Sequence, residues 1–234
     1  MGMKIKTIFG LASVLSLFAL CACATDADGD DGFDAGTVCP ADGTNGYGMP
    51  NRGTFVDERD GQEYKYTTIG NQVWMAQNLN YKTYYSMLHE KEYKDCAECG
   101  CWYNLEINLP NREVMDSVCP AGWKVPTIED WNILFTTIGN VSTALRVLLS
   151  ESWGFVQSTN ACGFNGIEAG AIRKNKDEFV FLNGSAGWCT QTVISPENVL
   201  KVFFRPGSKN EKSNGIEIDR AKNYYVSLRC IRDL

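Results

Sequence analysis

Two segments that lie far apart in the chain constrain its fold most. They read CPAGWKVPTIEDW, from Cys119 to Trp131, and LRCIRD, from Leu228 to Asp233. In the first, Thr127 is a candidate N-cap with Asp130 three residues later, and apolar residues follow at the spacing of an amphipathic helix. The second closes a segment, Tyr224 to Ile231, that alternates apolar and polar residues as a half-buried strand does. Each segment carries a cysteine, and we expect the two to meet at one edge of a domain.

A hairpin and a third strand are expected earlier in the chain. Strand-like segments flank Asp60-Gly61, which is a strong hairpin signal, and Gln72 to Ala76 follows the next turn. Trp74 and Met75 are consecutive in that third strand, so they point to opposite faces and both faces must be at least partly covered. Helices in the middle with strands at both ends give an α+β class. The expected helices span 127–137 and 141–151, and the expected strands span 53–57, 63–69, 72–76, 179–182, 187–193, 199–204 and 224–231.

Residues 1–22 have the pattern of a lipoprotein signal peptide. Lys4 and Lys6 precede a mostly apolar stretch from Ile8 to Leu20, and Leu20-Cys21-Ala22-Cys23 resembles the lipobox that the lipoprotein signal peptidase cleaves. Cleavage there would leave Cys23 as a diacylated N-terminal residue and tie the protein to a membrane through its lipid. The alternatives are an ordinary signal peptide and an uncleaved anchor. The anchor is disfavoured because the apolar run is shorter than the roughly 18 residues that a spanning helix needs.

Residues 23–52 are expected to be an acidic, flexible tether. Asp26, Asp28 and Asp30 have the spacing of a calcium loop, but the glycine and glutamate that an EF-hand needs at its sixth and twelfth places are absent. An acidic run beside the lipid-bearing Cys23 resembles the surface-export signals of some bacterial lipoproteins. We therefore expect a lipid-anchored protein of the outer membrane, displayed at the cell surface.

Composition limits the classes of partner and fold. The remaining residues, 53–234, number about 180, which is enough for one hydrophobic core and therefore for a single domain. The net charge of −6 disfavours binding to nucleic acid. Ten cysteines are typical of an exported protein, and the eight that follow Cys23 are expected to form disulfides in an oxidising compartment.

Neither a metal, a cofactor nor an enzymatic reaction is expected. Cys96, Cys99 and Cys101 include the Cys-x-x-Cys spacing of zinc ligands, but a second such pair is missing. His89 is the only histidine, which leaves little material for a serine triad or a metal hydrolase. Paired carboxylates could serve a glycosidase, yet nothing in the sequence separates them from ordinary surface residues.

Aromatic side chains offer a route to sugar binding. The chain has six tryptophans and ten tyrosines, and an aromatic face packs well on the apolar face of a sugar ring. The tryptophans inside the motifs above are expected to be structural. Trp102, Tyr84 and Tyr85 lie in an irregular, cysteine-rich stretch and are the candidate ligand-binding residues, with an extended polysaccharide as the expected partner.

Three motifs in order resemble a known family. GQEYKYTTIGNQVWMAQNLNY, from Gly61 to Tyr81, is followed by CPAGWKVPTIEDW and then by SLRCIRD. This order resembles the Fibrobacter succinogenes major paralogous domain of bacterial surface and secreted proteins, over roughly Thr54 to Asp233. That family is similar in turn to the C-type-lectin-like and formylglycine-generating-enzyme folds. The resemblance implies a C-type-lectin-like domain with short strands at both ends around two helices and with long, disulfide-stapled loops.

The resemblance also implies disulfides, whereas the expected function rests on the surface address, the aromatic residues and the single histidine. In lectin-like folds a cysteine near the first helix bonds to the last strand, which implies a Cys119–Cys230 bridge. Cys162 and Cys189 fall in the long-loop region and make a plausible second bridge. We expect a non-enzymatic binding or adhesion role, with a structural envelope protein and an enzyme of the formylglycine-generating type as alternatives. The cysteines left without an assigned partner are Cys39, Cys96, Cys99 and Cys101.

Overall fold

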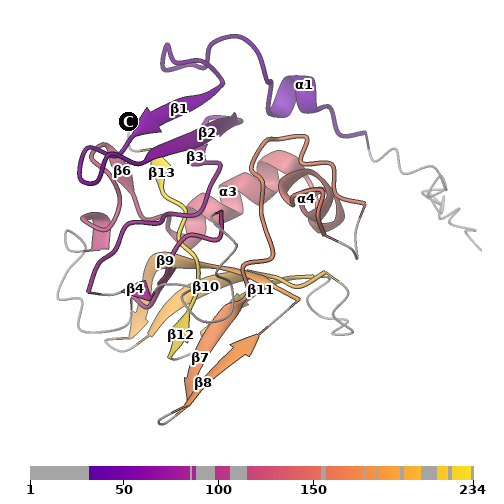
Figure 1. The fold of residues 1–234 in the computed structure, drawn as a ribbon. Helices are drawn as coiled ribbons and strands as arrows, with labels where there is room; N and C mark the ends of the chain where they lie inside the picture. The colour runs from indigo at the N-terminus through magenta and orange to yellow at the C-terminus, as the bar shows by residue number, and fades with distance from the viewer. Residues whose placement is uncertain are drawn as a thin grey trace, which may run out of the picture. The chain divides into compact units, whose positions relative to one another are not determined.

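The computed structural model describes ten stretches of the chain. The expected signal peptide, the lipid anchor Cys23, and Tyr85 lie outside the described residues. Figure 1 shows the path of the chain. The described stretches are 32–84, 86–87, 98–105, 115–153, 157–175, 178–182, 184–195, 198–206, 215–220 and 223–232. The elements are α1 (Ala35–Val38), β1 (Arg52–Val56), β2 (Glu63–Ile69), β3 (Gln72–Met75), β4 (Ser86–Met87), β5 (Trp102–Tyr103), β6 (Trp123–Lys124), α3 (Ile128–Ile138), α4 (Val141–Leu148), β7 (Ala171–Asn175), β8 (Glu178–Leu182), β9 (Ala186–Ser195), β10 (Asn198–Phe204), β11 (Ile216–Asp219), β12 (Tyr224–Tyr225) and β13 (Ile231–Arg232).

A five-stranded sheet joins the two ends of the domain. Its order is β1-β2-β3-β13-β6, and β1 and β2 form the hairpin that Asp60-Gly61 predicts. The late strand β13 lies between two early ones, since Ile231 pairs with Trp74 of β3 and with Lys124 of β6. The CPAGWK and LRCIRD segments therefore meet, as their sequences predict (Figure 1).

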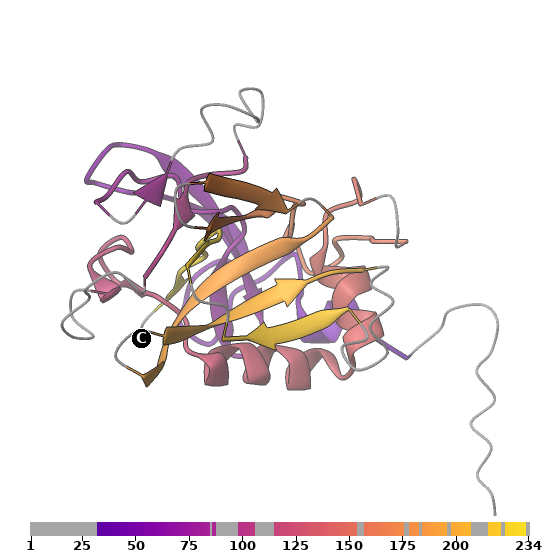
Figure 2. The same ribbon diagram turned by 90° about the horizontal axis from the view of Figure 1, so that it is seen from below.

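Helix α3 begins where its capping residues predict. The Asp130 backbone N–H donates to the Thr127 hydroxyl at 3.1 Å, and the Thr127 N–H donates to the Asp130 carboxylate at 2.7 Å, so two otherwise unpaired donors are satisfied. The helix buries Trp131, Leu134 and Ile138. These residues share a hydrophobic core with side chains of β9 and β10, and Figure 2 shows α3 running alongside that sheet.

Both faces of β3 are covered, as its sequence predicts. Trp74 and Met75 are both fully buried, but in different cores. Trp74 belongs to the helix-side core, which contains the buried side chains of α3 and α4. Met75 belongs to a second core, which contains Tyr64, Tyr103 and Phe203. Strands on both sides of central helices place the domain in the α+β class.

The later part of the domain holds two three-stranded sheets, β11-β10-β9 and β12-β7-β8. β7 and β11 are absent from the sequence-based expectation. The single strand expected over 224–231 is divided, because this segment passes from one sheet to another. It pairs with β7 at Tyr224 and Tyr225, makes single bridges to Tyr103 and Trp188, and then enters the five-stranded sheet as β13.

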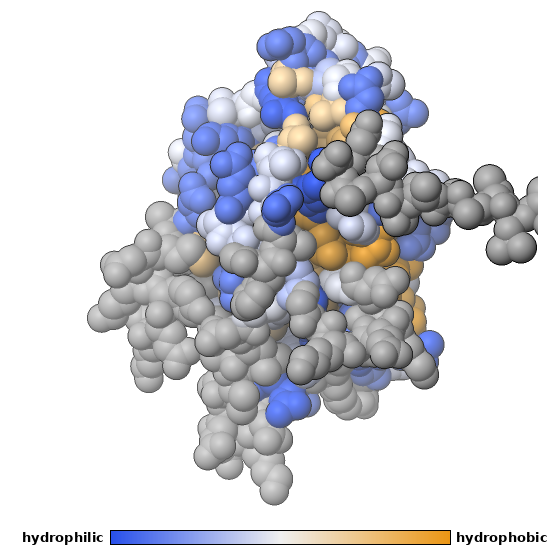
Figure 3. All heavy atoms as spheres, turned by 90° about the vertical axis from the view of Figure 1, so that its right-hand side faces the viewer, coloured by the Kyte–Doolittle hydropathy of each residue, from blue (hydrophilic) through white to orange (hydrophobic). Residues whose placement is uncertain are grey.

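The expected boundary between tether and domain, at residue 52, lies too far along the chain, because residues before it already belong to the folded domain. The Arg52 guanidinium donates to the Cys39 carbonyl at 3.2 Å and to the Ala161 carbonyl at 2.5 Å, and Cys39 is bonded to Cys162. Figure 3 views the side of the molecule that carries α1 and α4 and shows apolar side chains gathered among hydrophilic ones. The compact unit of the domain therefore starts at Gly32. Apolar residues of this N-terminal stretch that pack against the helix-side core are Phe33, Ala35 and Val38.

One expected disulfide is present and the other is wrong. Cys119 is bonded to Cys230, the bridge that the family resemblance implies. Cys162 is bonded to Cys39 rather than to Cys189. The reason is that Cys162 and Cys189 point into different cores: Cys162 lies in the helix-side core and Cys189 in the second one.

Within the described ranges, no helix is both long enough and apolar enough to cross a membrane.

Candidate functional site

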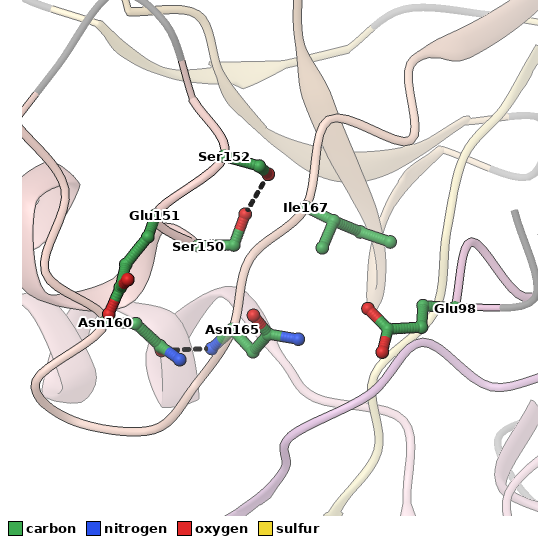
Figure 4. A pocket seen from close by; sticks show the side chains of 7 residues that line it. All are labelled: Glu98, Ser150, Glu151, Ser152, Asn160, Asn165 and Ile167. Atoms are coloured by element: carbon green, nitrogen blue, oxygen red, sulfur yellow. Dashed lines mark hydrogen bonds between the residues drawn. The ribbon is translucent and has the colours of Figure 1, made fainter.

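A polar pocket opens beside the loops that follow α4. Its cavity volume is about 320 Å³, which lies at the lower end of the range for small-molecule sites. Figure 4 shows Glu98 and Glu151 on opposite sides of the group, with Asn165 and Ile167 between them. Ile167 is the one apolar residue of the lining. The lining consists of Glu98, Ser150, Glu151, Ser152, Asn160, Asn165 and Ile167.

Two segments form most of this pocket: a first arm, residues 150–153, and a second arm, residues 160–167. Hydrogen bonds hold the two arms together. The Trp153 indole N–H donates to the Gly166 carbonyl at 2.6 Å, and the Ser150 N–H donates to the same carbonyl at 2.9 Å. The Ser150 and Ser152 hydroxyls lie 2.7 Å apart and bond to each other. The Cys39–Cys162 disulfide fixes the second arm to the N-terminal stretch of the domain.

Two asparagines give the second arm its shape. Asn160 and Asn165 have φ values of 47° and 54°, in the left-handed region that asparagine enters more readily than most residues. The Asn160 side-chain oxygen accepts the Asn165 backbone N–H at 2.7 Å. Among the described residues, none hydrogen-bonds the side-chain amide of Asn165. That amide is therefore available to a ligand in the pocket.

Beneath the pocket, the buried side chain of Asn78 forms four hydrogen bonds. Its oxygen accepts the Trp188 indole N–H at 3.1 Å and the Arg229 Nε–H at 2.8 Å. Its nitrogen donates to the Cys99 carbonyl at 3.1 Å and to the Ser227 hydroxyl at 3.0 Å. An asparagine amide offers two donors and an acceptor with two lone pairs, so this side chain uses its full capacity.

Arg229 extends the same network to the second arm. Its guanidinium donates to the carbonyls of Phe164 and Asn165, the latter at 2.7 Å, and lies 4.3 Å above the Phe164 ring. Burial lowers the pKa of Arg229 to about 9, an effect that the charge of Glu98 opposes. The guanidinium therefore stays charged at neutral pH.

The two walls of the pocket are thus joined through Asn78 and Arg229. Cys99, next to Glu98, is held by Asn78, and Asn165 is held by Arg229. Cys99 is also disulfide-bonded. The direct bond between Asn78 and Arg229 links the wall that carries Glu98 to the wall that carries Asn165. Substitution of either Asn78 or Arg229 should therefore shift the residues that line the pocket.

The residues of this network lie within a segment that matches a known protein family. A model of the Fibrobacter succinogenes major domain matches residues 67–232, which is more than half of the chain. The chain belongs to this family. No curated protein and no solved structure matches the chain. In this Fibrobacter succinogenes major domain, the early and late motifs contribute Asn78 and Arg229 to one buried network.

Sequence reasoning identified the motifs of the Fibrobacter succinogenes major domain but missed this network and the pocket. Asn78 and Arg229 stood inside those motifs without an assigned role. The pocket residues resemble ordinary loop residues, and they come together only through long-range contacts. One local signal was available: Asn165-Gly166 is a turn dipeptide of the kind that adopts left-handed backbone.

Of the three aromatic residues expected to bind ligand, Trp102 is buried rather than exposed. Trp102 is only 3% exposed, and its indole N–H donates to the Ala169 carbonyl at 3.1 Å, so its ring cannot stack on a sugar. Tyr84 is 86% exposed, but neither it nor Trp102 lines the pocket. Tyr85 lies outside the described residues. Tyr103, the other residue of strand β5, belongs to the second core, whereas the Trp102 indole is directed to the segment of Ala169.

Among the described residues, Cys101 and Cys189 are buried thiols. Cys101 donates weakly to the Asn80 side chain at 3.5 Å, and Cys189 donates to the Tyr103 carbonyl at 3.3 Å. Burial raises the pKa of the Cys101 thiol, which disfavours the reactive thiolate. Across the described stretches, no group of three or more acidic, cysteine or histidine side chains is arranged to hold a metal ion.

Proposed function

We propose that this protein is a lipid-anchored surface protein of the outer membrane whose domain binds carbohydrate, without transforming it, in the polar pocket. The observation that supports the proposal is the chemistry of the lining, which combines carboxylates, amides and hydroxyls with one apolar wall. The C-type-lectin-like fold is part of the same proposal. It is supported by the five-stranded sheet that joins both ends of the domain and by the Cys119–Cys230 bridge.

The lining complements a ring that bears several hydroxyl groups. Each sugar hydroxyl both donates and accepts hydrogen bonds, whereas a carboxylate only accepts and an amide does both. Glu98 and Glu151 can accept from hydroxyls, and the Asn165 amide can bond to a neighbouring hydroxyl in either sense. Ile167 offers an apolar surface for the C–H face of the ring. The fixed arms reduce the entropy that the site loses on binding.

A binding role suits the pocket better than hydrolysis does. A glycosidase needs one carboxyl group in an apolar setting that keeps it protonated, next to a second that stays charged. Glu98 and Glu151 both lie in exposed positions. The two serine hydroxyls of the lining bond to each other, and the seven lining residues include no histidine that could activate them.

Replacing Asn165 with glycine should weaken carbohydrate binding about tenfold, the equivalent of one or two hydrogen bonds. Glycine adopts the φ of 54° without strain, so the change removes the amide while it preserves the turn. Asn223→Gly is the matched control, because Asn223 also has a positive φ, of 64°, and does not line the pocket.

The measurement starts with a glycan array and with retention of the purified protein on cellulose, xylan and peptidoglycan. The affinities of both variants for the best ligand are then compared. Retention on none of these ligands would favour a structural envelope protein. Equal affinity of Asn165→Gly and the wild type would place the binding site elsewhere, and release of shortened sugars would indicate an enzyme.

The lipid anchor has its own test. Cys23→Ser should abolish labelling by a radioactive fatty acid and move the protein from the membrane fraction to the soluble one. Cys21→Ser is the matched control and should leave both readouts unchanged, because the bulky Leu20 does not fit the small-residue position next to the cleavage site. Labelling that survives in Cys23→Ser would contradict the assignment.

A further inference from the structure

The charges around the pocket are unbalanced. Glu98 and Glu151 are both exposed and both line the cavity, and no lysine or arginine belongs to the lining. Among the described residues, no cation forms an ion pair with the Glu151 carboxylate. A ligand that enters between these two side chains therefore meets negative charge on opposite sides.

Arg229 is the cation that interacts electrostatically with Glu98, but it cannot contact a ligand. Its side chain is only 1% exposed. Its three nitrogens donate to Asn78, Phe164 and Asn165, and the Phe164 ring lies against the guanidinium. It can offset part of the charge of Glu98 from below, and it leaves Glu151 uncompensated.

The groups that face the cavity can also coordinate an ammonium group. A primary ammonium carries three N–H donors and no acceptor, so it needs oxygen atoms around it. Figure 4 shows the Glu98 carboxylate at one side of the pocket and the oxygen of the Asn165 amide turned toward Ser150, so oxygen atoms line the cavity from more than one direction. A hydrogen bond between an ammonium and a carboxylate is about twice as strong as a bond between neutral groups.

On the premise that the pocket binds carbohydrate, as proposed above, we propose that it selects amino sugars over neutral sugars and rejects uronic acids. An amino sugar is a hydroxylated ring that carries a protonated amine. The ammonium gains from both carboxylates. A ligand carboxylate meets repulsion from both and finds no accessible cation. Neutral sugars bind through their hydroxyl groups alone and rank between the two.

Three oligosaccharides that share the β-1,4 linkage and differ at one substituent test this ranking. They are the glucosamine tetramer, cellotetraose and the tetramer of glucuronic acid, titrated calorimetrically into the purified protein at pH 6. We expect the glucosamine tetramer to bind at least tenfold more tightly than cellotetraose, and the glucuronate tetramer at least tenfold more weakly. The ratio of glucosamine-tetramer affinity to cellotetraose affinity should fall at about 0.5 M salt, because salt screens charges at exposed sites.

Glu151→Gln is the decisive variant, since it removes a charge that has no partner while Arg229 keeps its counter-charge at Glu98. It should lower the ratio of glucosamine to cellotetraose affinity at least threefold. Glu58→Gln removes an exposed charge outside the pocket and should leave the ratio unchanged. Equal binding of the three tetramers, or a ratio that neither salt nor Glu151→Gln changes, would overturn the charge preference and retain carbohydrate binding. Binding of none of them would overturn both proposals.

Discussion

Replacing Asn78 with alanine should lower the free energy of unfolding by about 3 to 5 kcal/mol, because each buried polar group left unpaired costs about 1 to 3 kcal/mol. The substitution leaves four groups without this partner: the Trp188 indole, the Arg229 Nε–H, the Cys99 carbonyl and the Ser227 hydroxyl. The side chain is only 2% exposed, so bulk water does not reach these groups without some opening of the structure.

Urea unfolding, followed by tryptophan fluorescence, measures the effect of Asn78→Ala. Asn71→Ala is the control, since Asn71 is an exposed turn residue for which a change within about 0.5 kcal/mol is expected. Ligand affinity should fall as well in Asn78→Ala, because both walls of the pocket depend on the network. A loss of stability below about 1 kcal/mol would mean that water substitutes for the amide and that the network is not a main source of stability.

Replacing both Cys119 and Cys230 with alanine should destabilise the domain by about 4 to 5 kcal/mol in the chain-entropy model. The bridge spans 111 residues, so its removal restores a large amount of conformational freedom to the unfolded chain. It also joins the turn before α3 to the segment that enters the sheet as β13.

The Cys39→Ala/Cys162→Ala double variant is the matched comparison, because that bridge spans 123 residues and should contribute a similar amount. Both variants are unfolded in urea without reductant and compared with the wild type. A loss below about 1 kcal/mol for the Cys119 and Cys230 variant would mean that the unfolded chain keeps the two ends together without the bridge. A loss in the Cys39 and Cys162 variant alone would indicate that attachment of the N-terminal stretch matters more.

Local signals predicted the local structure correctly. The Asp60-Gly61 hairpin and the capping pair of Thr127 and Asp130 form as expected, because each depends on residues only a few positions apart. The opposite orientations of Trp74 and Met75 follow from the geometry of any strand, and the structure covers both faces. The Cys119–Cys230 bridge was accessible only through resemblance to a known fold.

Long-range features were beyond such signals. Nothing near Cys162 in the sequence indicates that its partner is Cys39. The sequence also does not show that Cys162 and Cys189 lie in different cores, which is what prevents a bridge between them. Trp102 lies in a cysteine-rich stretch without clear periodicity, yet it is buried and its strand contacts the distant residues Ala169 and Val226. The pocket depends on the same kind of contact, since Glu98 and the loop of Asn165 are brought together by a network that spans most of the domain.

The position of β13 sets the order in which the protein can form. This strand, at Ile231–Arg232, is the last of the domain in sequence, yet it lies inside the five-stranded sheet between β3 and β6. Until it arrives, β3 and β6 each have an unpaired edge, and Arg229 is not yet present beneath the pocket. Sheets closed by such distant pairings fold slowly, because the chain loses the entropy of closing a long loop before the contacts form. A nascent chain therefore cannot complete the five-stranded sheet until β13 has been synthesised.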